Sequence, residues 1–189
     1  MKQFFLILLC ATLFEISNAQ TSYGVKGGLN LSHDVGIDAS NSKNFKAGFH
    51  AGVFAGFLIK EKLSIQPELM YSGQGGYYNN GVTQFSTLHY LKLPVLVKYT
   101  TASGFYGETG PQVGYLMGVK TDPTDFSKPT LQSLTRSDFS WAFGIGYKSA
   151  SNVGVDLRYN LGFTDTYKSG VKVHNNAFQL GLHYVLIRK

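Results

Sequence analysis

Nine charged side chains share one parity of an alternating pattern, and they are the residues of this chain best placed to do chemistry. In segment after segment a charged, polar or glycine residue alternates with an apolar one, and successive side chains of a strand point to opposite faces. The charged set comprises Lys26, Glu68, Lys92, Lys98, Glu108, Asp138, Lys148, Asp156 and Arg158. Its five cations and four anions nearly cancel. We therefore predict a network of ion pairs on an enclosed face, because buried charges need partners.

Other spacings that could support catalysis or metal binding are weaker than this network. Glu68 and Glu108 could act as paired acid and base carboxylates, but their strands are not neighbours and lysines on the same face offer partners. His50 and His183 share the charged face, yet no third metal ligand stands at a suitable spacing. His89 is the one histidine near the apolar face, and it lacks a convincing serine and acid. We expect no enzymatic activity, no metal and no cofactor.

Eight predicted strands position these charges, each with apolar or aromatic residues on its opposite face. We expect them at Tyr23–Ser32, Phe45–Ile59, Leu63–Ser72, Leu88–Thr100, Phe105–Val119, Asp138–Ser149, Val153–Leu161 and Asn176–Leu186. Each reaches the roughly 9 to 11 residues that a tilted strand needs to cross a bilayer. An apolar outer face and a polar inner face are typical of outer-membrane barrels. The sequence thus predicts an all-β fold, an eight-stranded antiparallel up-and-down transmembrane β-barrel.

The connections between these strands alternate between long and short, as in barrels with tight periplasmic turns and longer external loops. The long ones are Asp34–Asn44, Gly73–Thr87, Lys120–Ser137 and Gly162–Asn175. An even number of strands then places both termini in the periplasm. Three prolines within strands, Pro67, Pro94 and Pro111, cannot donate to the ladder. Bulges could accommodate them.

The first 19 residues are typical of a signal peptide. Lys2 supplies the positive charge, an apolar run extends from Phe4 to Phe14, and small residues at Ser17 and Ala19 predict cleavage before Gln20. Residues 20–189 then form one barrel domain. The single cysteine lies in the leader, so the exported chain would have no disulfides. The net charge of +6 comes from scattered lysines, which excludes a nucleic-acid footprint.

Motifs in these strands also point to a family. They lie at Gly24–Ser32, Gly48–Gly52, Ile65–Ser72, Leu91–Leu96, Gly110–Leu116 and Asp156–Asn160. They resemble outer-membrane β-barrel proteins of Bacteroidota, labelled porin-family or PorT-like, within the small barrels of the OmpA/OmpX type. The resemblance covers the whole chain after the leader, and it implies structural or adhesive surface roles or links to secretion and gliding machinery. Such barrels tend to end on an aromatic residue, whereas this chain ends on Ile187-Arg188-Lys189.

The predicted function is that of an integral protein of the bacterial outer membrane with a filled interior and a structural or interaction role through its external loops. Barrels of eight strands are just wide enough for side chains to fill them, although the inward glycines would leave room for water. The alternatives are a narrow porin-like channel for ions or small solutes, an accessory component of a protein secretion machinery, and a soluble barrel that binds an apolar ligand inside.

The expected partners are outer-membrane lipid and lipopolysaccharide, with a protein at the loops as a further candidate and no nucleic acid. Long basic side chains in the loops suit lipopolysaccharide phosphates, namely Lys120, Lys128, Arg136, Lys168 and Lys172. Aromatic residues should form two belts at the membrane interfaces. The periplasmic belt comprises Tyr23, Phe57, Tyr99, Phe105, Tyr147 and Tyr184, and the outer belt comprises Phe49, Tyr71, Tyr115, Trp141, Tyr159 and Phe178.

Overall fold

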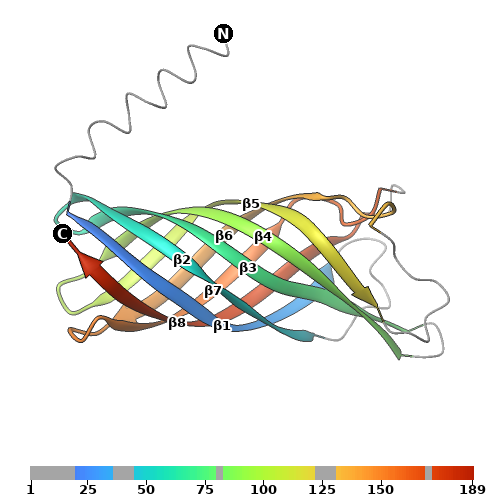
Figure 1. The fold of residues 1–189 in the computed structure, drawn as a ribbon, viewed down its shortest axis with the longest axis horizontal. Coiled ribbons are helices and arrows are strands. Elements are labelled where there is room, and N and C mark those ends of the chain that lie inside the picture. The colour runs from blue at the N-terminus through green and yellow to red at the C-terminus, as the bar shows by residue number, and fades with distance from the viewer. Residues whose placement is uncertain (1–19, 36–44, 80–82, 122–130, 169–171) are drawn as a thin grey trace, which may run out of the picture.

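The computed structural model describes residues 20–35, 45–79, 83–121, 131–168 and 172–189. The predicted signal peptide lies outside these residues. Eight antiparallel strands follow in chain order: β1 (Thr21–Val35), β2 (Lys46–Lys60), β3 (Leu63–Asn79), β4 (Thr83–Thr100), β5 (Phe105–Thr121), β6 (Ser137–Lys148), β7 (Val153–Gly162) and β8 (His174–Arg188). Each pairs with its neighbours in sequence, and β1 also pairs with β8, which closes the barrel (Figure 1). The predicted fold class is confirmed.

The alternating pattern sorts side chains between the outside and the inside of this barrel. On β7, Val155 and Leu157 are exposed, whereas Asp156 and Arg158 are only 2 % and 1 % exposed. Soluble proteins show the opposite distribution, with apolar residues inside and charged residues almost never fully buried. The alternative of a soluble barrel with an apolar interior is therefore wrong. Among the described residues, no helix is long and apolar enough to cross a membrane.

The start of β1 and the end of β8 lie at the same end of the barrel as the three short connections, which we call the turn end; the opposite end is the loop end (Figure 1). The backbones of Thr21 and Lys189 exchange hydrogen bonds of 3.0 and 2.8 Å there. Two of the short turns contain a residue in the left-handed region, Gly104 with φ 93° and Asn152 with φ 66°. Glycine and asparagine tolerate this conformation best, which explains why these turns are tight.

The predicted loop Gly73–Thr87 is wrong, because β3 and β4 continue through most of it. The two strands stay in register from Gly73 opposite His89 to Asn79 opposite Thr83. The glycines that suggested a loop instead permit a close approach of the strands. Gly75 has φ 143°, and a Cβ atom there would collide with the carbonyl oxygen of Ser86. Pairing context thus overrides the low β-propensity of the segment.

The strand prolines are not at bulges. Pro67 faces Val95 and Pro94 faces Gln112 within regular register. Pro111 likewise faces Trp141. The irregularities in register lie elsewhere, between Tyr23 and Gly24, between Leu58 and Lys60, and between His89 and Tyr90.

None of the twelve predicted belt aromatics is buried inside the barrel. The register separates them into two groups. The six expected at the periplasm lie near the turn end, where the rings of Phe105 and Tyr147 are 5.0 Å apart. The other six lie closer to the loop end, where Tyr159 and Phe178 are 4.7 Å apart. The outward orientation required by the prediction is confirmed.

Candidate functional site

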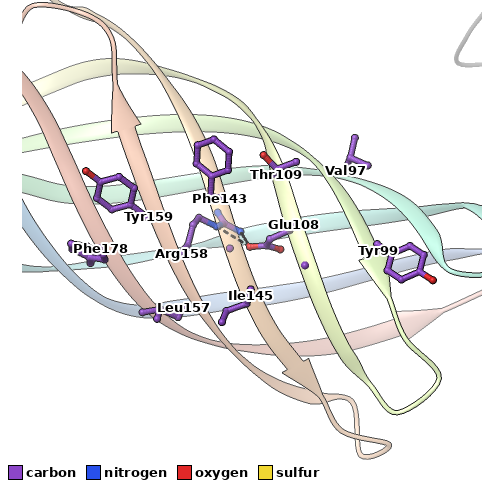
Figure 2. Close-up of a pocket in the computed structure, with 12 residues that line it drawn as sticks. Val97, Tyr99, Glu108, Thr109, Phe143, Ile145, Leu157, Arg158, Tyr159 and Phe178 are labelled. Carbon is purple, nitrogen blue, oxygen red and sulfur yellow. Dashed lines mark hydrogen bonds and ion pairs between the residues drawn. The ribbon is translucent and has the colours of Figure 1, made fainter.

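Arg158 on β7 is the centre of the barrel interior. Its Nη1 and Nη2 donate to the two carboxylate oxygens of Glu68 on β3, each at 2.9 Å. Its Nε and Nη2 donate to Oε1 of Glu108 on β5, at 2.9 and 2.7 Å (Figure 2). The planar guanidinium matches carboxylates in this two-pronged way. We call these three residues the Arg158 clamp, because it ties three non-adjacent strands together across the interior.

Inward glycines make room for the buried charged side chains. A Cβ atom at Gly144 on β6 would lie 2.9 Å from both Cγ and Oε1 of Glu108, and one at Gly181 on β8 would lie 2.9 Å from Oδ1 of Asp156. Such contacts are too short for real side chains. The space that the sequence suggested for water is therefore occupied at these levels by long charged side chains.

A second ion pair lies beside the clamp. Nζ of Lys26 on β1 is 2.7 Å from Oδ1 of Asp156 on β7, and both side chains are at most 3 % exposed. The other oxygen of Asp156 lies 3.4 Å from Nδ1 of His183 on β8. His183 thus has an acidic partner. Together with the clamp, these residues join β1, β3, β5, β7 and β8.

Two further lysines of the predicted network lie on either side of the clamp along the barrel axis. Lys92 is 3.1 Å from Asp138 and also donates to Oε1 of Gln74 at 3.2 Å, on the loop-end side. Lys98 lies on the turn-end side, where its Nζ is 3.9 Å from Oε2 of Glu108 and 3.5 Å from the ring centroid of Tyr106. Lys98 is therefore held by a long ion pair and a cation–π contact.

Lys148 is the one predicted network residue that the structure does not bring to an acidic partner among the described residues. It is the last residue of β6 and is half-buried in the mouth of the barrel at the turn end. The parity of the strand directs it inward, but its position along the strand places it beyond the carboxylates. The other eight predicted residues are all in ion pairs.

A layer of amides and hydroxyls on the loop-end side of the clamp was not singled out from the sequence. Asn30 is its hub: Nδ2 donates to the hydroxyl of Ser72 at 3.0 Å, and Oδ1 lies 2.7 Å from Nδ1 of His50 and accepts from Gln179 at 3.0 Å. Asn30 does lie on the charged parity, and that signal could have found it. Among the described residues, no three His, Cys, Asp or Glu side chains gather around a metal-sized space.

Apolar side chains close the loop end over this polar interior. The loop-end cap comprises Leu88, Tyr90, Leu116 and Leu134, all at most 4 % exposed. Leu134 comes from the predicted loop Lys120–Ser137 and forms a β-bridge with Tyr167. Leu116 N donates to the carbonyl of Arg136 at 2.7 Å. The cap was not predicted; the sequence signal that could have found it is a pair of leucines, Leu131 and Leu134, in an otherwise polar loop.

The outer face carries a shallow apolar groove rather than a second site. It has a volume of about 560 Å³, and its lining includes Gly107, where a Cβ atom would meet open space. Figure 2 shows the rings of Tyr99, Phe143 and Tyr159 along it. On the same face, Tyr71 OH lies 2.6 Å from Nδ1 of His89. Hydrocarbon chains of lipid suit a groove of this composition.

Residues 18–168 match the model of a family described as outer membrane protein beta-barrel domain. The chain belongs to this family. Membership places the protein in the bacterial outer membrane, while the narrower assignment to Bacteroidota or to PorT-like proteins remains a prediction. No curated protein matches the sequence.

Solved outer-membrane barrels are similar in fold. Neisserial surface protein A is 14 % identical over 87 % of this chain and 97 % of its own, with a TM-score of 0.58. Ail, the attachment invasion locus protein of Yersinia pestis, is 17 % identical over 89 % and 99 %, with a TM-score of 0.49. OprG from Pseudomonas aeruginosa is 14 % identical over 90 % and 98 %, with a TM-score of 0.48. The first of these supports the barrel fold, and the fold alone.

Proposed function

We propose that this chain is a closed, non-enzymatic outer-membrane barrel whose role is structural or interactive and is carried by its loop end. The observation that carries the proposal is the Arg158 clamp, in which every side chain is at most 1 % exposed. A water-filled channel would leave water-sized space beside these charges. The alternative of a narrow channel for ions or small solutes therefore requires a second state in which the clamp has separated.

The contacts of the candidate catalytic groups support a role without enzymatic activity. Glu68 and Glu108 accept hydrogen bonds from the same guanidinium, so both side chains are committed to a structural contact. A general base must also reach the proton it removes, and these groups are buried. His89 on the outer face is bound to Tyr71 instead of a serine.

The described part of the loop end supports a binding role. The β3–β4 ladder continues to Asn79, seven residues past Ser72, the last β3 residue paired with β2 (Figure 1). Binding residues commonly lie on loops held by such a rigid scaffold. Lys120, Arg136, Lys168 and Lys172 could contact lipopolysaccharide phosphates there, while Lys128 lies outside the described residues. A protein partner, including a secretion machinery, would use the same end.

The topology supports an orientation with the turn end in the periplasm. Tight turns face the periplasm and longer loops face outward in barrels of this kind. The start of β1 and the end of β8 lie with the tight turns (Figure 1), so both ends of the barrel domain would be periplasmic.

Conductance separates the closed barrel from the channel. The purified protein, reconstituted in planar bilayers, should give no steady current at low voltage. A stable current that is absent from control preparations without the protein would refute the closed barrel and support the channel.

A lipopolysaccharide-binding assay tests the loop-end role. A variant with Lys120, Arg136, Lys168 and Lys172 changed to Gln should lose binding to lipopolysaccharide vesicles but keep its folded barrel. Lys60→Gln with Lys62→Gln, two exposed lysines of the turn end, is a control for loss of positive charge away from the loops. Equal binding by the wild type and the loop-end variant would refute the lipopolysaccharide contact.

A further inference from the structure

A polar vestibule opens at the turn end of the barrel. Its volume is about 240 Å³, and its walls combine Ser22, Ser64 and Gln66 with three cationic residues, Lys98, Lys148 and Arg188. Its inner end is filled by Phe54 and Tyr106, which are 6 % and 4 % exposed, and by the Arg158 clamp behind them. The vestibule is therefore closed at its inner end, so it can hold a solute but does not continue through the barrel.

The charges around the vestibule do not cancel. Glu61, in the β2–β3 turn, is the only acidic residue that lines it among the described residues, against three cations. His183 also lines the wall, and its Nδ1 is directed to Asp156. The acidic residues of the clamp are already bound to Arg158. An excess of about two positive charges therefore faces the cavity.

The cation at the inner end of the vestibule has incomplete hydrogen bonding. A lysine ammonium has three N–H donors. Nζ of Lys98 lies 3.5 Å from Oε1 of Gln66 and 3.9 Å from Oε2 of Glu108, both longer than a normal charge-assisted bond of about 2.7–2.9 Å. Oε2 of Glu108 correspondingly has no hydrogen-bond partner among the described residues. The ring of Tyr106, 3.5 Å from Nζ, offers no full hydrogen-bond acceptor, so this ammonium can still donate to an anion that enters the cavity.

We propose that the turn-end vestibule binds a phosphate group, carried either by a free solute or by the headgroup of a phospholipid. A phosphate monoester at neutral pH carries about 1.5 to 2 negative charges and three strong acceptor oxygens, which match the excess charge and the donors of the site. Arg188 and Lys148 at the mouth would capture the phosphate, since arginine binds phosphate through two parallel bonds. Lys98 would donate from the inner end. This inference is independent of the loop-end role.

Isothermal titration of the full chain, purified in a non-ionic detergent at constant ionic strength, tests the proposal. The two probes are inorganic phosphate and dibutanoyl phosphatidic acid, a water-soluble headgroup mimic. Saturable binding of inorganic phosphate would identify a free solute as sufficient, and binding of the lipid mimic alone would identify a headgroup. Saturable binding of neither probe would overturn the proposal.

A charge-matched pair of variants shows whether binding occurs in the cavity. Lys148→Gln with Arg188→Gln removes two charge-assisted donors and should weaken binding by about tenfold or more. Neither residue belongs to the ion-pair network, so the barrel should remain folded. Lys60→Gln with Lys62→Gln removes the same charge from the same end outside the cavity and should leave affinity nearly unchanged. Equal weakening in both variants would mean that phosphate is attracted by the basic surface in general, and binding in the cavity would be refuted.

Protection of a thiol gives a second measurement that does not depend on removing charge. Ser64→Cys in a Cys10→Ser background places a single thiol on the vestibule wall. Phosphate should slow its reaction with a small neutral thiol reagent. Ser151→Cys in the exposed β6–β7 turn is the control and should react at the same rate with and without phosphate. Loss of this difference would contradict binding in the vestibule.

Discussion

Replacement of Arg158 by Gln should destabilise the barrel more than any other single change of charge in it. The guanidinium makes four hydrogen bonds of 2.7–2.9 Å to two carboxylates that are at most 1 % exposed. Without it, among the residues that the structure describes, Glu68 keeps one hydrogen bond from Gln66 at 2.8 Å, and Glu108 keeps only Lys98 at 3.9 Å. Two negative charges would then remain in an enclosed interior with little compensation.

The expected size follows from this loss. Breaking a buried ion pair from one side typically costs about 3–5 kcal/mol, because the abandoned charge stays buried. Arg158→Gln should fall in or above this range in the free energy of unfolding. Glu108→Gln should cost less than Arg158→Gln, because it leaves the guanidinium paired with Glu68 and removes one of two anions.

Urea unfolding of the purified barrel in lipid vesicles measures the effect, with the shift in electrophoretic mobility of the folded form as the readout. Lys148→Gln is the matched control, since that lysine is inward but outside the network, and its change should stay within about 0.5 kcal/mol. The double variant Arg158→Gln with Glu68→Gln should be more stable than the sum of its single changes predicts. A change below about 1 kcal/mol for Arg158→Gln would mean that the interior charges are solvated, and the closed-barrel proposal would fail.

Three other substitutions test the packing around this cluster. Gly144→Ala should cost about 1–3 kcal/mol in unfolding free energy, because its Cβ would lie 2.9 Å from Glu108. The control Gly107→Ala, where nothing lies within 4 Å of the new Cβ, should be neutral or slightly stabilising. Equal effects of the two substitutions would contradict the reasoning. Leu134→Ala should cost about 2–5 kcal/mol through the cap, measured in the same assay, while a neutral result would show that the cap is not packed. Leu134→Asp should open the cap without producing current in planar bilayers, since the clamp still closes the interior; the appearance of current would place the closure at the cap instead.

The strands were predictable because their alternation is imposed by two different solvents. A residue such as Leu157 must face lipid and its neighbour Arg158 must not, so a period of two survives along each strand. The same rule fails where a strand leaves the bilayer. Beyond Ser72, both faces of β3 can be polar, and glycine and asparagine then resemble a loop even though the backbone remains paired with β4.

Pairing inside the barrel was less predictable than parity. The network was expected as a set, but its pairs were not assigned: Glu68 and Glu108 lie on strands that are not neighbours, yet both reach Arg158. In a narrow barrel, inward side chains meet across the interior as well as along the wall. Which ones meet depends on their height along the axis, and that height changes with the register of every intervening strand. The shift between His89 and Tyr90 has no clear signal in a single sequence.

The polar interior can itself be understood from the export route. β5 spans 17 residues, Phe105 to Thr121. With apolar residues on both faces, it would approach the roughly 17–25 apolar residues that span a membrane as a helix. Such a segment would be expected to stop in the inner membrane. Alternation avoids this outcome, but it forces polar groups into a closed interior, where each needs a partner. Ion pairs such as the Arg158 clamp therefore follow from the need to keep each strand only half apolar, whatever they contribute to stability.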